Sequence, residues 1–126
     1  MRRLLLDTNV VVWLLLGDRA AVSEAAVQAL SDERNRVFVS AVSVWEIAIK
    51  RSLGKLRIEP GWARALTRLD FEPLPVTAPH AQRVERLPWH HRDPFDRLLL
   101  AQAELEAHAL VTADAQLEAY DIEIVW

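Results

Sequence analysis

Short apolar runs alternate with longer segments that carry helix signals, and this alternation constrains the fold more than any other feature of the chain. The runs at 3–6, 37–39 and 109–111 have the length of strands and are continuous rather than alternating in polarity. Continuous runs are typical of strands that are buried on both faces of a parallel sheet. Because the connections are short, we expect an α/β fold with helices on both faces of a mostly parallel sheet.

Capping residues and glycines indicate where the helices begin and end. Gly17 should end a first helix, and Ser23 and Ser43 should cap the next two. The expected helices cover 8–16, 23–32, 43–54, 60–70, 77–87 and 93–108, with a short one after Asp114. The prolines in 72–76 allow only an edge strand there, and 122–125 is the expected last strand.

Composition limits the class of protein. The 126 residues are 52% hydrophobic, which fits one domain over 1–126 with a substantial core. There is no cysteine, which excludes disulfides, thiolate zinc sites and a cysteine nucleophile, and which fits a cytoplasmic protein. No apolar run approaches the roughly 18 residues that cross a bilayer. The apolar start is interrupted at Asp7 without a signal-peptide cleavage site, so we expect a first strand and no membrane segment.

Acidic residues follow the predicted strands. Asp7 closes the first strand, Asp114 follows the strand at 109–111, and Glu46 lies on the helix after the second strand. Asp93 and Asp96 begin the long helix at 93–108. Since ligands bind beyond the carboxyl ends of parallel strands, these acids should share one rim of the sheet. Clustered carboxylates repel one another, and Mg²⁺ or Mn²⁺ relieves that repulsion while supporting phosphodiester hydrolysis.

Each acid except Asp7 also has a purely structural interpretation. Ser43 and Glu46 form a possible capping box, while Asp93 and Asp114 are natural N-caps. Asp96 in a first helical turn would be stabilised by the helix dipole. Asp7 is harder to explain in this way, because an acid at the end of a buried strand needs a partner.

Four motifs in register resemble those of the PIN-domain nucleases, and above all the VapC-like toxins of type II toxin–antitoxin pairs. They are Leu-Leu-Asp-Thr-Asn at 5–9, Ser-Val-Trp-Glu-Ile at 43–47, Asp-Pro-Phe-Asp-Arg-Leu-Leu at 93–99 and Leu-Val-Thr-Ala-Asp at 110–114. The resemblance covers essentially the whole chain. It implies a three-layer α/β/α sandwich, Mg²⁺- or Mn²⁺-dependent endoribonuclease activity, a cognate antitoxin and a homodimer.

The resemblance also implies roles for individual residues. The family's acids match Asp7, Glu46, Asp96 and Asp114; its usual polar neighbours match Asn9 and Thr112; Asp93 is an additional acid beside them. As a hypothesis, Asp7, Asp96 and Asp114 bind the metal, and Glu46 either joins them or orients the attacking water. A metal-activated water would then attack a backbone phosphate of RNA, leaving a 5′-phosphate and a 3′-hydroxyl.

Basic residues are unevenly distributed. Residues 1–97 contain all 15 Lys and Arg, whereas 98–126 contain six acids and none of these cations. A phosphate-binding track is one interpretation and an ordinary solvated surface the other; the track would comprise Lys50, Arg51, Lys55, Arg92 and Arg97.

Aromatic and imidazole side chains have two interpretations each. For His90 and His91 we favour surface or packing roles over a contact with substrate phosphate. Apolar helix faces predict a core position for Trp13 and Trp45. Trp62 and Trp89 are candidates to face an antitoxin, since aromatics often anchor interfaces.

Three rival functions remain open on the sequence. A PIN-like interaction module without catalysis would keep the fold but would not need the complete set of acids. A phosphoacceptor receiver domain also gathers acids at strand ends, but it requires a late lysine, and no lysine follows Lys55. A nuclease acting on DNA would use the same phosphate chemistry, and only the family resemblance favours RNA.

Overall fold

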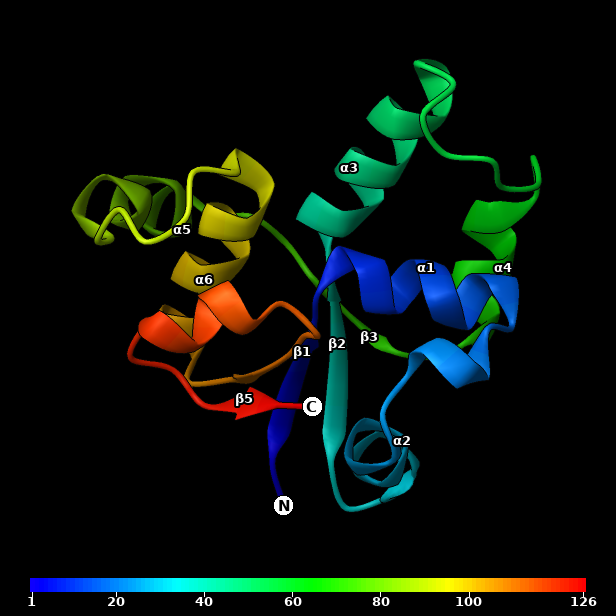
Figure 1. Cartoon of the computed structure of the whole chain (residues 1–126), viewed down its shortest axis with the longest axis horizontal. Coiled ribbons are helices and arrows are strands. Elements are labelled where there is room, and N and C mark those ends of the chain that lie inside the picture. The colour runs from blue at the N-terminus through cyan, green and yellow to red at the C-terminus, as the bar shows by residue number, and fades with distance from the viewer.

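A five-stranded parallel sheet forms the centre of the computed structural model, which describes residues 1–126 (Figure 1). The strand order is β3-β2-β1-β4-β5, and every neighbouring pair is parallel. The strands are β1 (Arg3–Leu6), β2 (Arg36–Ser40), β3 (Glu72–Leu74), β4 (Ala109–Val111) and β5 (Ile124–Val125). The expected parallel α/β sheet is confirmed, with β3 as an edge strand and a last strand two residues shorter than predicted.

Helices cover both faces of this sheet, as the continuous apolar strands predict (Figure 1). One face packs against α1 (Thr8–Leu16), α2 (Glu24–Ser31) and α4 (Trp62–Arg68). The other face packs against α6 (Pro94–Glu106), with α5 (Ala78–Arg83) beside it. Side chains of β1 alternate between the two cores, because Leu4 and Leu6 belong to one and Leu5 to the other. The result is a three-layer α/β/α sandwich.

Most helix ends lie where the capping residues indicate. Gly17 ends α1 in the left-handed conformation at φ 69°, and Ser23 caps α2 by accepting a hydrogen bond from Ala26 N–H. Asp93 caps α6 through the N–H groups of Phe95 and Asp96. The segments predicted at 60–70 and 77–87 are shorter as α-helices, and 3-10 turns replace α-helix at Val84–Arg86 and Ala115–Ala119.

The start of α3 (Ala41–Ser52) differs from the prediction of a cap at Ser43. Strand β2 continues to Ser40, whose hydroxyl accepts the hydrogen bond from Val42 N–H and caps the helix. Strand and helix therefore join without a loop, and Ser43 lies in the first helical turn. Its buried hydroxyl shares a 2.9 Å hydrogen bond with the Thr8 hydroxyl. Glu46 consequently lies beyond the first turn, and the capping-box interpretation of this acid is wrong.

The α6 helix is buried as its apolar sequence predicts, but it also carries two buried polar side chains, Arg97 and Gln102. Gln102 accepts a hydrogen bond from the Ser40 hydroxyl and donates one to the Pro75 carbonyl, so it ties α6 to β2 and to the segment after β3. No helix is both long and apolar enough to cross a bilayer.

Candidate functional site

The carboxyl ends of the parallel strands bring together acids from four distant parts of the sequence. Asp7 follows β1, Asp114 follows β4, Glu46 projects from α3 and Asp96 from the first turn of α6. They are close enough to affect one another's pKa values. Repulsion from Glu46 and Asp114 contributes to the raised pKa of Asp7, after the larger effect of burial. We conclude that the acids expected at one rim of the sheet do meet there.

Asp7 is buried, with only 5% of its surface exposed. Burial is the main cause of its raised pKa, because a buried carboxylate loses the hydration that stabilises its charge. The Thr112 hydroxyl opposes this effect by donating a 2.6 Å hydrogen bond to Asp7 Oδ2. Thr112 Oγ1 also accepts a hydrogen bond from Asp114 N–H, so one hydroxyl links the ends of β1 and β4.

Asp96 has the most perturbed carboxyl group of the site. Burial, followed by repulsion from Asp7 and Asp93, raises its pKa to about 7. The neighbouring His91 acts in the opposite direction on this pKa. The raised pKa values of Asp7 and Asp96 therefore oppose the ionisation of these two carboxyl groups, as expected of a cluster of acids that suits a cation.

Glu46 has one satisfied and one unsatisfied carboxylate oxygen. Its Oε2 forms an ion pair with Lys50 Nζ, which lies one helical turn later on α3, at 2.6 Å. Its Oε1 is buried and has no hydrogen-bond partner. An unpartnered buried carboxylate oxygen is strongly destabilising unless a cation or a water molecule binds it. This atom provides the clearest indication that the site fits a divalent cation with its waters.

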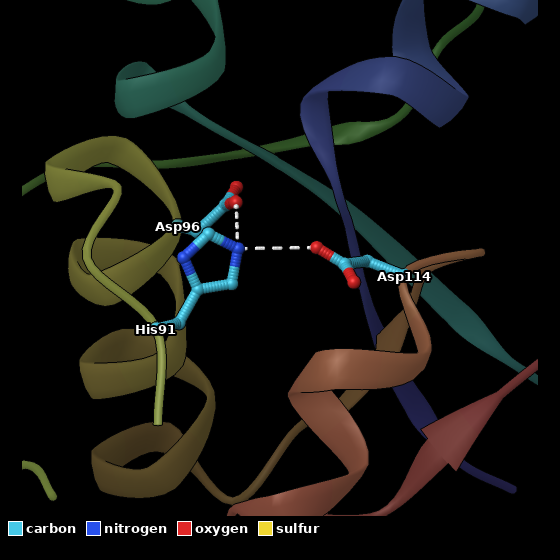
Figure 2. A group of neighbouring side chains, drawn as sticks. All are labelled: His91, Asp96 and Asp114. Carbon is cyan, nitrogen blue, oxygen red and sulfur yellow. Dashed lines mark hydrogen bonds and ion pairs between the residues drawn. The ribbon is translucent and has the colours of Figure 1, made fainter. Parts of the chain in front are cut away.

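Asp114 is joined to Asp96 by a residue whose role the sequence did not reveal. The His91 ring lies between the two carboxylates, with Nε2 at 3.1 Å from Oδ2 of each (Figure 2). One donor atom from each of these three residues lies within 4.8 Å of the other two, a spacing that a metal ion could span. A surface or packing role was expected for His91, because adjacent residues usually point in different directions and His90 and His91 were not expected to share one metal.

The other residues expected near the acids have separate positions. Asp93 accepts the capping hydrogen bonds of α6, so its carboxylate serves that helix while raising the pKa of Asp96. Asn9 is exposed on the first turn of α1, two residues beyond Asp7. Thr112 contacts Asp7 directly, as described above. The positions of Asp93 and Thr112 suit supporting roles around the acids.

Four of the five residues of the expected basic track reach the surface. Arg51, Lys55 and Arg92 are exposed, and Lys50 is partly exposed while paired with Glu46. Arg97 is only 2% exposed, so it cannot belong to a surface track. Its guanidinium donates hydrogen bonds to four backbone carbonyls, of residues 84, 87, 88 and 91, and lies 3.8 Å from the centre of the Trp89 ring.

Tryptophan positions differ in part from expectation. The prediction of a core position for Trp45 is wrong, because 56% of its surface is exposed. Its ring contacts Phe95 edge-on at 5.1 Å between ring centres. Trp13 and Trp62 are partly buried and pack against the core on the α1 face. Trp89 is 73% exposed.

Comparisons with known proteins agree with this architecture. The PIN domain family model matches residues 4–123. VapBC2 from Rickettsia felis, solved with a DNA fragment from its promoter, superimposes with a TM-score of 0.70 at 15% identity, covering 97% of this chain and 96% of that one. VapBC-1 from nontypeable Haemophilus influenzae gives 0.68 at 18% identity, covering 97% and 96%.

FitAcB from Neisseria gonorrhoeae gives a TM-score of 0.62 at 23% identity, covering 96% of this chain and 95% of that one. Comparison with curated protein sequences found no match. The structural similarities establish the fold, and the family model covers nearly the full length of the sequence. The chain therefore belongs to the PIN-domain family.

Proposed function

We propose that this protein is a Mg²⁺- or Mn²⁺-dependent endoribonuclease and the toxin of a toxin–antitoxin pair. The observation that carries the proposal is the meeting of Asp7, Glu46, Asp96 and Asp114 at the carboxyl edge of the sheet. Two features of that cluster favour a cation over a purely structural role: the unpartnered Glu46 Oε1, and the Asp96 pKa of about 7.

The metal would be held by Asp7, Asp96 and Asp114, whose carboxylate oxygens are the ligands that Mg²⁺ and Mn²⁺ prefer. When bound, the ion would supply positive charge that stabilises a phosphate oxygen and makes a water molecule more acidic. Glu46 Oε1 is free to accept a hydrogen bond from a water molecule and so to orient it. The Thr112 hydrogen bond favours the ionised form of Asp7, the form that binds a cation.

RNA would approach along exposed basic residues of α3 and the loops beside it. Arg51 and Lys55 follow Glu46 on the same helix and the turn after it, and Arg92 precedes α6. Such cations attract the phosphate backbone without reading its sequence. Lys50 would join them if a metal ion released it from Glu46. Arg97 is excluded from this role because it is buried.

The proposed partners are a cognate antitoxin and a second copy of the chain. The structural neighbours include a toxin–antitoxin complex from Klebsiella pneumoniae and a VapBC toxin–antitoxin protein from Mycobacterium tuberculosis. Their folds match this one at 22% and 21% identity. Light scattering of the purified chain would test the proposed homodimer, and co-expression with any small protein encoded next to it would test the antitoxin.

The proposal is tested by incubating structured RNAs with the purified protein in Mg²⁺, Mn²⁺ or EDTA. Asp7→Asn and an Asp7→Ala/Asp96→Ala double variant should abolish the metal-dependent cleavage. The matched control is Asp18→Asn, because Asp18 is exposed and its side chain makes no capping hydrogen bond. If Asp7→Asn cleaved RNA in Mg²⁺ at the rate of the wild type, the assignment of the site would be refuted.

The alternative function is a PIN-like interaction module that binds a partner without cutting nucleic acid. It predicts no cleavage of RNA or of single-stranded DNA by folded, partner-free protein at any metal concentration. It also predicts that Asp7→Asn leaves partner binding unchanged. Including DNA substrates in the same assay distinguishes an RNA-directed enzyme from a DNA-directed one.

A further inference from the structure

His91 lies inside the cluster of acids but belongs to none of the four motifs that define it. Its side chain is only 14% exposed, and its ring fills the space between Asp96 on α6 and Asp114 after β4 (Figure 2). Its neighbour His90 is exposed and packs edge-on against Tyr120 instead. Two adjacent histidines therefore have different environments, and only His91 contacts the carboxylates.

The hydrogen bonds of the ring determine which nitrogen carries the proton. His91 Nδ1 lies 3.1 Å from the backbone N–H of Asp93 and accepts a hydrogen bond from it. A backbone N–H only donates, so Nδ1 must present its lone pair, and the ring proton resides on Nε2. The Nε2–H group then donates to Asp114 Oδ2 at 3.1 Å, and Asp96 Oδ2 lies at the same distance from Nε2.

This tautomer cannot bind a metal ion in the observed position. A protonated Nε2 has no lone pair to offer. Moving the proton to Nδ1 would point it at the Asp93 N–H, and the two donors would repel each other. The imidazole thus donates a hydrogen bond to one of the proposed metal-binding carboxylates and lies against a second. It lies between two side chains that would hold a cation.

We propose that His91 is a positioning residue that stands in for the metal ion and leaves when the ion binds. It holds Asp96 and Asp114 together in the metal-free protein, and its release opposes metal binding and so sets the affinity of the site. This inference rests on the proposed function, because it assumes that these acids bind the metal.

The surrounding contacts indicate that only the side chain needs to move. The backbone N–H of His91 donates to the Tyr120 hydroxyl at 3.0 Å, and its carbonyl accepts from Arg97 at 3.3 Å. Both partners are buried, so the backbone at residue 91 is anchored on both sides. A rotation of the side chain is then sufficient to free both carboxylates.

The test measures Mn²⁺ binding by the electron paramagnetic resonance signal of the free ion, using full-length folded protein. His91→Ala should bind Mn²⁺ about tenfold more tightly than wild type, the size expected when a hydrogen bond to a charged acceptor no longer competes. His91→Gln, which keeps a neutral donor, should lie between the two. His90→Ala is the matched control and should bind as wild type does.

A second measurement follows the ring itself by ¹⁵N NMR with Mg²⁺. The metal-free protein should show a protonated Nε2 and an unprotonated Nδ1, and saturation with Mg²⁺ should shift both signals as the ring leaves the carboxylates. Weaker or unchanged Mn²⁺ binding by His91→Ala would overturn the proposal, and so would an unprotonated Nε2 in the metal-free protein.

Failure of the proposed function gives a different result. If Asp96→Asn removes Mn²⁺ binding while His91→Ala leaves it unchanged, the metal site stands and only the role of His91 is refuted. If neither folded wild type nor His91→Ala binds Mn²⁺ saturably, the metal-dependent function fails and the role of His91 fails with it.

Discussion

The hydroxyl of Thr112 donates a 2.6 Å hydrogen bond to Asp7 Oδ2, joining two residues that are 105 positions apart in the sequence. The Thr112 hydroxyl oxygen also accepts a hydrogen bond from the Asp114 backbone N–H. A single buried side chain therefore connects the acid after β1 with the acid after β4. The geometry of the site depends on this connection as much as on the acids themselves.

Replacing Thr112 with Val should remove both hydrogen bonds while keeping the shape of the side chain. We expect the pKa of Asp7 to rise further, because the hydrogen bond that favours its ionised form is lost. The metal-free protein should lose about 1–3 kcal/mol of unfolding free energy, and Mn²⁺ should bind more weakly near neutral pH. Urea unfolding and Mn²⁺ titration check these outcomes. Thr67→Val, at an exposed position on α4, is the control and should change neither quantity.

Asp96 should make the stability of the metal-free protein depend on pH. Its pKa is about 7 in the folded state against 3.8 for an unperturbed aspartate. Between these values the unfolded chain has lost a proton that the folded chain keeps, so the free energy of unfolding falls as pH rises from about 4 to about 7 and is constant above. Asp96→Asn cannot ionise and should lack this decline.

The expected difference is up to about 4 kcal/mol in favour of Asp96→Asn at about pH 8, and little at about pH 4. Urea unfolding in EDTA at several pH values measures it, with Asp18→Asn as the control for removing an exposed carboxylate. Saturating Mg²⁺ should abolish the advantage, because the ion stabilises ionised Asp96 in the wild type. Equal pH profiles for wild type and Asp96→Asn would contradict the raised pKa.

Arg97 should be critical for stability rather than for RNA binding. Its guanidinium bonds to four carbonyls of the segment between α5 and α6. Arg97→Met would leave several of these carbonyls buried without a donor, so we expect a loss of about 3 kcal/mol or more in unfolding free energy. Arg92→Met, at an exposed neighbouring position, should stay within about 0.5 kcal/mol of wild type. Unfolding of both variants in urea provides the comparison.

The exposed basic residues should govern the salt dependence of RNA binding. We expect the double variant Arg51→Gln/Lys55→Gln to bind RNA more weakly and to show a shallower slope of log affinity against log salt. Each phosphate contact that is lost should reduce the slope by about 0.7 for single-stranded RNA. The assay uses Ca²⁺ in place of Mg²⁺ to limit cleavage. An unchanged slope would remove these two residues from the RNA-binding surface.

Sequence periodicity was sufficient to predict the layers of the fold and the position of the acids. The continuous apolar runs at β1, β2 and β4 predicted buried parallel strands, and the carboxyl ends of such strands meet at one edge. The acids that follow them could therefore be grouped without coordinates. Helix ends marked by Gly17, Ser23 and Asp93 were predicted for the same reason, because each has a local chemical signature.

The remaining features depend on contacts that no local pattern encodes. Ser40 and Ser43 both precede apolar helical residues, and only the length of β2 selects Ser40 as the cap. Arg97 is buried because carbonyls of the loop that precedes its helix, 6 to 13 residues earlier, converge on its guanidinium, whereas its charge alone predicts exposure. The contacts of His91 with Asp96 and Asp114 follow from the path of a loop that contains neither a periodic pattern nor a glycine.

The strand order has a consequence for the synthesis of the chain. β1 is made before the other four strands, yet it lies at the centre of the sheet beside β4, which is made long after it. Until residues 112 and 114 have left the ribosome, Asp7 has neither its Thr112 partner nor Asp114 beside it. A growing chain therefore cannot assemble the acid cluster before that point.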